Sequence, residues 1–144
     1  METRKGLGLK IQKEIIEKSE NRLKPLLSIK IGVKSPIIFH GSYGSPDWIV
    51  IDDKAKIHCF ELKPIDSKNR KSMIPTPLQE KRFLQILKKR IPITLVYYQY
   101  NPKRKKFNYG GTIELYKSED LRQIMKLSWG EIINKAKQKS FKLK

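Results

Sequence analysis

Two short β-rich runs separated by a turn segment constrain the fold of this chain more than any other feature of the sequence. The runs are Asp47–Ile51 and Ile57–Leu62, and the residues between them, 52–56, have the composition of a hairpin turn. Both faces of each run carry apolar side chains. Because an apolar face must be shielded from water, other parts of the chain must cover this hairpin on both sides. The sequence therefore predicts a buried β-hairpin inside a layered domain.

Counting residues about the hairpin turn predicts which polar side chains meet. Asp47 lies seven residues before Lys54 and Glu61 lies seven residues after it. If Lys54 is the centre of the turn, the two carboxylates lie directly opposite each other on one face of the antiparallel pair. The alternation of side chains along a strand places Lys63 on the same face. We therefore expect Asp47, Glu61 and Lys63 to gather at one end of the hairpin.

The remaining polar residues of the hairpin have simpler interpretations. Asp52 and Asp53 are expected to be solvated at the turn, and His58, which alternates with Phe60, is expected to be a hydrogen-bonded core residue. Cys59 lies in an apolar run, where a single cysteine behaves as a small hydrophobic residue. No chemical role is assigned to these four side chains.

Further elements are predicted on either side of the hairpin. They are an amphipathic helix over 7–27, one or two strands over 28–39, a turn-rich loop over 40–46, a basic loop over 66–73, a helix opening at Thr76, a strand over 91–100, a loop over 101–111, a strand over 112–116, and short helices starting at Ser118 and Ser128. A basic, frayed tail is expected over about 135–144. The chain is therefore expected to be a single domain over 1–144 with an α/β fold, a mixed β-sheet of four to five strands flanked by helices on both faces.

The charge of the chain points to a polyanionic partner. Lys and Arg number 32 against 14 Asp and Glu, which gives a formal net charge of +18, while 38% of the residues are hydrophobic. Lys and Arg side chains that contact phosphates release condensed counterions, so nucleic acid is the expected partner. No apolar run is long enough for a spanning helix, and the N-terminus lacks the apolar segment of a signal peptide. The sequence predicts a soluble, intracellular, cytoplasmic protein without a membrane partner.

Two opposed carboxylates at the edge of a core need a cation. Mg²⁺ prefers hard oxygen ligands and often binds one or two carboxylates, with water and substrate phosphate in the other positions. Asp47 and Glu61 are the expected ligands, and the backbone carbonyl of Leu62 is a further one. The ammonium group of Lys63 is placed to orient a water molecule or to offset negative charge on a phosphate. Mn²⁺ is expected to substitute for Mg²⁺.

These residues resemble a known enzyme superfamily. Pro46-Asp47 followed by Glu61-Leu62-Lys63 is similar to the motif of the PD-(D/E)xK nucleases, which have a restriction-endonuclease-like core. The segment 45–97, with a helix opening at Thr76-Pro77-Leu78-Gln79, resembles VRR-Nuc-type domains. The N-terminal Arg4-Lys5-Gly6 leading into a helix that contains glutamate, together with the loop 41–46, resembles archaeal Holliday-junction resolvases.

The resemblance implies a role for each matching residue. Asp47 and Glu61 would bind the metal and Lys63 would assist catalysis. A glutamate on the first helix often joins the metal site in these families. They tend to place it where Lys10 falls here, and Glu14, one helical turn further on, is the chosen candidate. Gln79 is explained by helix capping alone, but related nucleases often place a glutamine at this helix start near the metal.

Basic and small polar residues around the motif are candidates for DNA contact. The run at 103–106 follows an aromatic strand, and the basic residues of the loop 66–73 come soon after the Glu61-Leu62-Lys63 strand. They are expected to hold the phosphate backbone rather than to read bases. The candidates are Arg4, Lys5, Ser42, Ser45, Lys68, Arg70, Lys71, Lys103, Arg104, Lys105 and Lys106.

The sequence thus predicts a magnesium-dependent DNA endonuclease, selective for structures such as Holliday junctions or other branched DNA. Junction cutting requires two symmetric incisions, so this hypothesis includes a homodimer. A monomer would favour a VRR-Nuc-like nicking or flap nuclease. The sequence is also compatible with a nonenzymatic DNA-binding protein of the same fold and with an RNA-processing nuclease. The composition is compatible with an archaeal protein or one from an archaeal virus, in which case it would act in the host cytoplasm.

Overall fold

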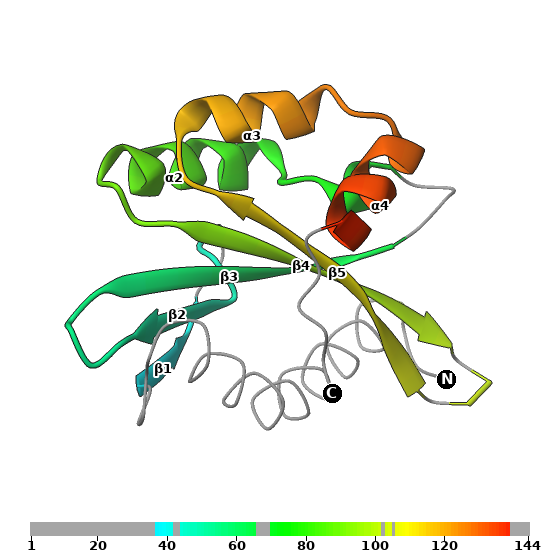
Figure 1. Ribbon diagram of the computed structural model, residues 1–144, viewed down its shortest axis with the longest axis horizontal. Helices are drawn as coiled ribbons and strands as arrows, with labels where there is room; N and C mark the ends of the chain where they lie inside the picture. Colours follow the sequence, from blue (N-terminus) through cyan, green and yellow to red (C-terminus); the bar gives the residue numbers. More distant parts are fainter. Residues whose placement is uncertain (1–36, 42–43, 66–69, 102, 105, 139–144) are drawn as a thin grey trace.

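The chain forms an α/β fold built on one five-stranded mixed sheet. The computed structural model describes residues 37–41, 44–65, 70–101, 103–104 and 106–138. The described elements are β1 (Ile37–His40), β2 (Trp48–Ile51), β3 (Ile57–Pro64), the 3₁₀ helix η1 (Arg70–Met73), α2 (Pro77–Lys88), β4 (Ile93–Asn101), β5 (Lys106–Leu115), α3 (Ser118–Met125) and α4 (Trp129–Gln138). Figure 1 shows the helices stacked above the sheet.

The strands follow their sequence order across the sheet, β1-β2-β3-β4-β5. Neighbouring strands are antiparallel except β3 and β4, which are parallel. Parallel neighbours need a crossover connection, and the segment containing η1 and α2 provides it. This βαβ unit brings the start of α2 toward the end of the hairpin that carries the predicted carboxylates.

The predicted hairpin register is confirmed. Trp48 pairs with Phe60 and Ile51 pairs with Ile57, which centres the hairpin on Lys54. The strand β2 begins at Trp48, so Asp47 lies one residue before it. Asp52 was expected to be solvated, but it is buried. Its carboxylate accepts hydrogen bonds from two backbone N–H groups of the turn and from His58, so the turn depends on this side chain.

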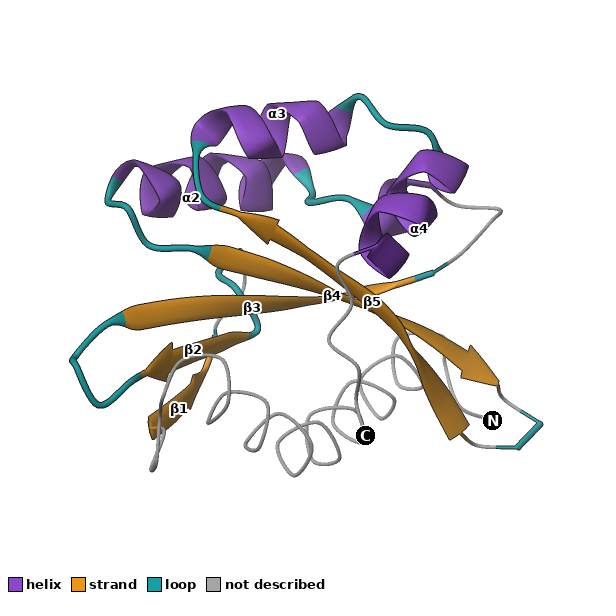
Figure 2. Ribbon diagram, in the orientation of Figure 1, coloured by secondary structure: helices purple, strands orange, loops and turns teal. Residues whose placement is uncertain are grey.

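The three described helices cover one face of the sheet (Figure 2). Their buried side chains pack on the face that carries Cys59, in a core that includes Phe83, Leu95, Leu121 and Ile132. The opposite face also contains buried side chains, including Trp48, Val50, Phe60 and Leu62. The helix predicted over 7–27 lies outside the described residues.

The prediction of a loop over 101–111 is wrong, because most of that segment belongs to a long β4–β5 hairpin. Tyr98 pairs with Tyr109 while Tyr97 pairs with Gly111, so Gly110 is an extra residue in a β-bulge. Gly111 has a φ of 109°, and a Cβ there would lie 2.3 Å from the carbonyl oxygen of Ala136. Gly111 therefore lets α4 approach the strand closely, whereas a Cβ at Gly110 would lie 2.3 Å from the side chain of Ile65.

The predicted basic tail starts too early. α4 continues to Gln138, and Ala136 is 1% exposed. Ile132 and Ala136 lie four residues apart and are both buried, which gives this short helix its core-facing side. Residues 139–144 lie outside the described part of the chain. The part of the chain that the structure describes has no helix long and apolar enough to cross a membrane.

Candidate active site

The structure brings four predicted site residues together at one end of the β2–β3 hairpin. Asp47 precedes β2, Glu61 and Lys63 lie on β3, and Gln79 lies in the first turn of α2. The hairpin register explains the meeting of the two acids, and the βαβ crossover explains the approach of Gln79. We refer to Asp47, Glu61, Lys63 and Gln79 as the carboxylate cluster.

The carboxylate of Asp47 is anchored to the neighbouring strand. Its Oδ2 atom accepts a hydrogen bond from the backbone N–H of Leu62 at 2.7 Å. The loop before it is closed by a hydrogen bond from the N–H of Gly41 to the carbonyl oxygen of Asp47, also 2.7 Å. A Cβ at Gly41 would lie 1.6 Å from the carbonyl oxygen of Pro46, so the loop closes this way only with glycine. The side chain of Asp47 is therefore held to β3, and its backbone to the residue that follows β1.

Gln79 connects Glu61 and Lys63, the acidic and the basic side chain that β3 contributes to the cluster. Its Oε1 atom accepts a hydrogen bond from the Lys63 Nζ atom at 2.8 Å, and its Nε2 atom donates to the Glu61 Oε1 atom at 3.3 Å. Gln79 is also the third helical residue of the predicted capping box. Its Oε1 atom accepts from the backbone N–H of Thr76 at 3.0 Å, and its own N–H donates to the Thr76 hydroxyl. The same amide therefore caps α2 and positions the charged groups.

Glu61 lies in an environment that disfavours its charge. The residue is 3% exposed, and its Oε2 atom is buried with no hydrogen-bond partner among the described residues. Burial raises the pKa of Glu61 well above its ordinary value, and the negative charge of Asp47 raises it further, whereas Lys63 partly offsets the shift. An additional positive charge beside the two acids would relieve this cost.

Lys63 is buried as well, at 6% exposed. Burial lowers the pKa of its ammonium group, and the negative charges of Glu61 and Asp47 act in the opposite direction. The site thus holds Glu61 and Lys63 away from bulk water, with the half-buried Asp47 beside them, and charges interact strongly in such surroundings.

Tyr98 is a site neighbour that sequence reasoning missed. Burial raises the pKa of its phenol to about 12, and the negative charge of Asp47 contributes to the shift. Tyr98 pairs with Pro64 through the parallel β3–β4 register. Its aromatic strand was visible in the sequence, but the register between strands separated by a helix was not.

The cluster lies next to a small pocket at the start of α2. This pocket measures about 260 Å³ and is lined by Gly44, Thr76, Pro77, Leu78 and Gln79. Gly44 has a φ of 81°, and a Cβ there would lie 3.0 Å from a methyl carbon of Leu78. Gln79 therefore lies both at this pocket and against Glu61 and Lys63 of the carboxylate cluster.

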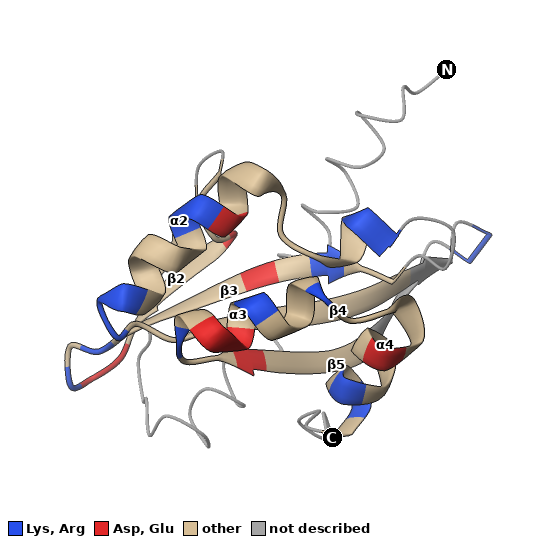
Figure 3. Cartoon of the chain, turned by 90° about the horizontal axis from the view of Figure 1, so that it is seen from above, with Lys and Arg blue, Asp and Glu red and all other residues tan. Residues whose placement is uncertain are grey.

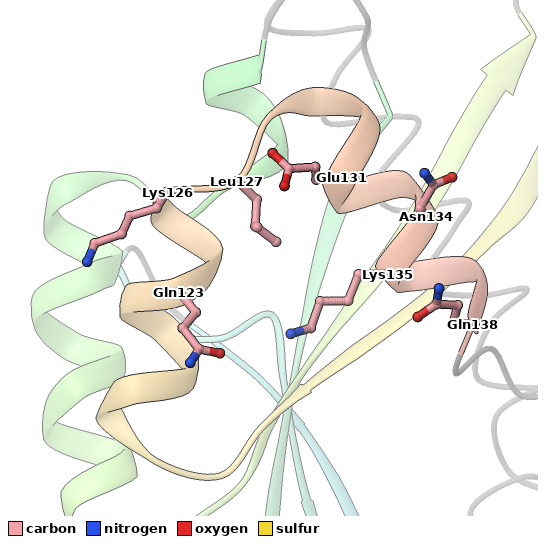
Figure 4. Close-up of a pocket in the computed structure, with 7 residues that line it drawn as sticks. All are labelled: Gln123, Lys126, Leu127, Glu131, Asn134, Lys135 and Gln138. Carbon is pink, nitrogen blue, oxygen red and sulfur yellow. The ribbon is translucent and has the colours of Figure 1, made fainter.

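A larger groove lies elsewhere, between α3 and α4. It measures about 560 Å³ and is lined by Gln123, Lys126, Leu127, Glu131, Asn134, Lys135 and Gln138. Figure 4 shows Lys135 reaching across this groove toward Gln123. No residue of the carboxylate cluster lines it.

The other candidate residues that the structure describes are spread over several elements. Arg70 donates to the carbonyl oxygens of Leu127 and Met125 at 2.6 and 2.7 Å, so its guanidinium group holds the end of α3. Ser45 is half-buried in the loop before β2, and Lys71 is exposed on η1. The remaining candidates are either in the β4–β5 connection or outside the described residues. Lys103 and Arg104 are exposed in the turn and Lys106 begins β5, whereas Arg4, Lys5, Glu14, Ser42, Lys68 and Lys105 are not described.

Comparisons with protein-family models, with curated proteins and with solved structures found no match to this chain. Within the described ranges, no group of three or more His, Cys, Asp or Glu side chains is placed to hold a metal ion. The carboxylate cluster contributes two such side chains, Asp47 and Glu61.

Proposed function

We propose that the protein is a magnesium-dependent DNA endonuclease that uses the carboxylate cluster to hydrolyse phosphodiester bonds. The observation that carries this proposal is the buried Glu61 Oε2 atom, which has no described hydrogen-bond partner and lies in a carboxylate next to Asp47. Two acids in this position fit a divalent cation, because Mg²⁺ binds one or two carboxylates and completes its shell with water and phosphate.

Asp47 and Glu61 would hold the ion, with the carbonyl oxygen of Leu62 as a further ligand. When bound, the ion supplies Lewis acidity and an activated water molecule. The chain supplies the positions of the ligands. The N–H of Leu62 fixes Asp47 Oδ2, and the Gln79 amide fixes Glu61 Oε1. One oxygen of each acid is therefore held in place by the chain itself.

Lys63 would stabilise negative charge on the phosphate. Its ammonium group is held by Gln79 Oε1 and is largely removed from water. A fixed positive charge in a dry site stabilises developing negative charge more strongly than a solvated one does. Because burial lowers its pKa, Lys63 also gives up a proton more readily than an exposed lysine.

The proposed substrate is DNA, with branched structures preferred. The support is the formal charge of +18, which favours a polyanion. Basic residues occur on α2, α3 and α4 as well as in the hairpin connections (Figure 3), which suits extended contact with a phosphate backbone. We propose a homodimer for the junction-cutting form of this activity, because two strands must be cut.

Cleavage assays test the proposal. The full chain is incubated with linear duplex, single-stranded, flap and four-way-junction DNA, and with matched RNA substrates, in Mg²⁺ or in EDTA. We expect Mg²⁺-dependent cutting of DNA by the wild type and a loss of about 100-fold or more in Asp47→Ala and Glu61→Ala. Asp53→Ala removes an exposed acid from the same hairpin and should cut like the wild type.

Two results would contradict the nuclease proposal: no cutting by the wild type, or equal cutting by the Asp47 and Glu61 variants. A preference for the RNA substrates would instead reassign the substrate. The mass of the protein in solution, measured by light scattering, tests the homodimer separately. A monomer that still cuts would favour single nicks or flap cleavage.

A further inference from the structure

An exposed apolar patch lies on the same sheet face as the carboxylate cluster. β1 lies at the edge of the sheet that the described residues form, and its residues Ile37 and Phe39 are 57% and 51% exposed. Ile37 lies in one cross-strand row with Ile51 and Ile57, and Ile57 is 37% exposed. We call Ile37, Phe39 and Ile57 the edge patch. Large exposed side chains grouped in this way mark a binding surface more often than isolated ones do.

The register places Phe39 one row away from the acids. Phe39 pairs with Ile49 and Ile49 pairs with Cys59, so these three side chains form a row on the face shared with Glu61. The next row along the same face contains Asp47 and Glu61. One row is about 7 Å along a strand and neighbouring strands lie about 5 Å apart, so the backbone of Phe39 lies about 8 Å from that of Asp47. This distance corresponds to about two stacked nucleotides along one DNA strand.

The charge of the chain favours nucleic acid as the occupant of the edge patch. The chain has a formal net charge of +18, and a nucleic acid brings the opposite charge. The edge patch itself is uncharged, so it suits the part of a nucleic acid that is not phosphate. Paired bases hide their faces in the duplex, and only unpaired bases can stack on an exposed ring.

We propose that Phe39 stacks on an unpaired base of the substrate, about two nucleotides from the phosphate at the carboxylate cluster. This inference rests on the proposed nuclease function and names its substrate class as DNA with unpaired bases beside the cut. Ile37 extends the apolar surface along β1. Fully paired DNA has no unpaired base that can stack on Phe39, so the protein would hold it through its phosphates alone.

Fluorescence of 2-aminopurine tests the stacking directly. Flap DNA carries the probe at single positions one to four nucleotides from the branch, and binding is measured in EDTA so that no cutting occurs. The wild type should quench the probe at one of these positions. Phe39→Ala should abolish the quenching and weaken flap binding about fivefold or more, while binding of fully paired duplex changes less than about twofold.

Two variants serve as controls. Phe39→Trp retains an aromatic ring and should retain both the quenching and the affinity. Trp129→Ala removes a 39% exposed aromatic residue from α4 and should behave like the wild type. If Phe39→Ala does not fold, Phe39→Leu removes the ring but keeps the apolar bulk, and the same loss of quenching is expected.

The results separate this inference from the nuclease proposal. If the wild type cuts flap DNA and the Phe39 variants lose neither quenching nor affinity, stacking is wrong and the nuclease proposal stands. If quenching depends on Phe39 but the wild type cuts nothing, the stacking surface stands and the nuclease proposal fails. If Phe39→Ala turns a dimer into a monomer and leaves flap binding unchanged, the edge patch is a contact between copies and the inference is overturned.

Discussion

Gln79 shows how one side chain can serve both folding and a site. Its Oε1 atom accepts from Thr76 N–H and from Lys63 Nζ, and only the carbonyl oxygen of an amide can accept both bonds. The Nε2 atom must then face Glu61, where it donates. Helix capping and site geometry therefore select the same orientation of this amide.

The charged form of Glu61 destabilises the folded protein when no cation is bound, because the carboxylate is buried. Its pKa is raised in the folded state, so its contribution to stability is greatest below its ordinary pKa of 4.5. This contribution is lost as the pH rises from that value toward the raised one, since the folded protein must then either hold the proton or bury the charge.

The variant Glu61→Gln should therefore be more stable than the wild type when divalent cations are absent. The amide can still accept the bond from Gln79 but carries no charge. We expect a gain on the order of 2 kcal/mol at pH 7 in EDTA, shrinking toward pH 4.5. Thermal unfolding between pH 4.5 and 9 measures it, with Asp53→Asn as a control. A lower stability of Glu61→Gln at every pH would show that the buried carboxylate is not a destabilising charge.

At the scale of elements, the β2–β3 hairpin was the most predictable part of the chain. Its register follows from the length of the turn and from the two-residue alternation, both of which are local properties of the sequence. The start of α2 was equally predictable, because its capping box is formed by Thr76 and Gln79, which are close in the sequence. The meeting of Asp47, Glu61 and Lys63 followed from the first of these signals alone.

Nonlocal contacts explain what the sequence did not reveal. Residues 101–111 were predicted to form a loop, but most of them belong to the β4–β5 hairpin, in which Gly110 is the extra residue of a bulge and Gly111 lies against α4. Tyr98 comes near Asp47 through the parallel pairing of β3 with β4. The burial of Ala136 likewise depends on a distant strand. Such contacts require the packing of elements that are far apart along the chain.

The hairpin turn supplies a pH-dependent prediction. Asp52 accepts hydrogen bonds from the N–H groups of Lys54 and Lys56 and from His58, and the bond with His58 is the main cause of the lowered pKa of Asp52. A lowered pKa means that the carboxylate stabilises the fold above its ordinary value of 3.8. This stabilisation disappears as the pH falls through the lowered value.

Asp52→Asn should consequently lower the melting temperature at pH 7, and the difference from the wild type should shrink below pH 3.8. Asp53→Asn changes the exposed neighbour and should have little effect at either pH. Thermal unfolding followed by circular dichroism provides the measurement. An unchanged melting temperature of Asp52→Asn at pH 7 would mean that the turn does not depend on this carboxylate.

At the scale of the whole molecule, charge and architecture make different contributions to the proposed DNA binding. The described helices lie on one sheet face, and the carboxylate cluster and the edge patch lie toward the end of that face formed by β1, β2 and β3. Basic residues are spread over many elements (Figure 3). Binding strength is thus expected to come from many dispersed phosphate contacts, and selectivity from the small region around the acids.

The proposed DNA binding should be strongly weakened by salt. If six or more phosphates are neutralised, affinity falls about 1,000-fold or more between 50 and 200 mM salt. A double change at the β4–β5 turn, Lys103→Ala with Arg104→Ala, should reduce the slope of log affinity against log salt by about two. Fluorescence anisotropy measures both quantities. A slope that is unaffected by the double change would remove this turn from the binding surface.

The hairpin turn also acts as a spacer for the site. Residues 52–56 set the pairing of β2 with β3, and the nearest of them lies well away from the acids along the strand. Because side chains alternate at every position, one inserted residue in this turn would shift the pairing by one and send one of the two acids to the opposite side of the sheet. The distance between the acids is therefore encoded in the number of turn residues, and loop-length variants of this hairpin would separate the two acids while every residue of the cluster stays the same.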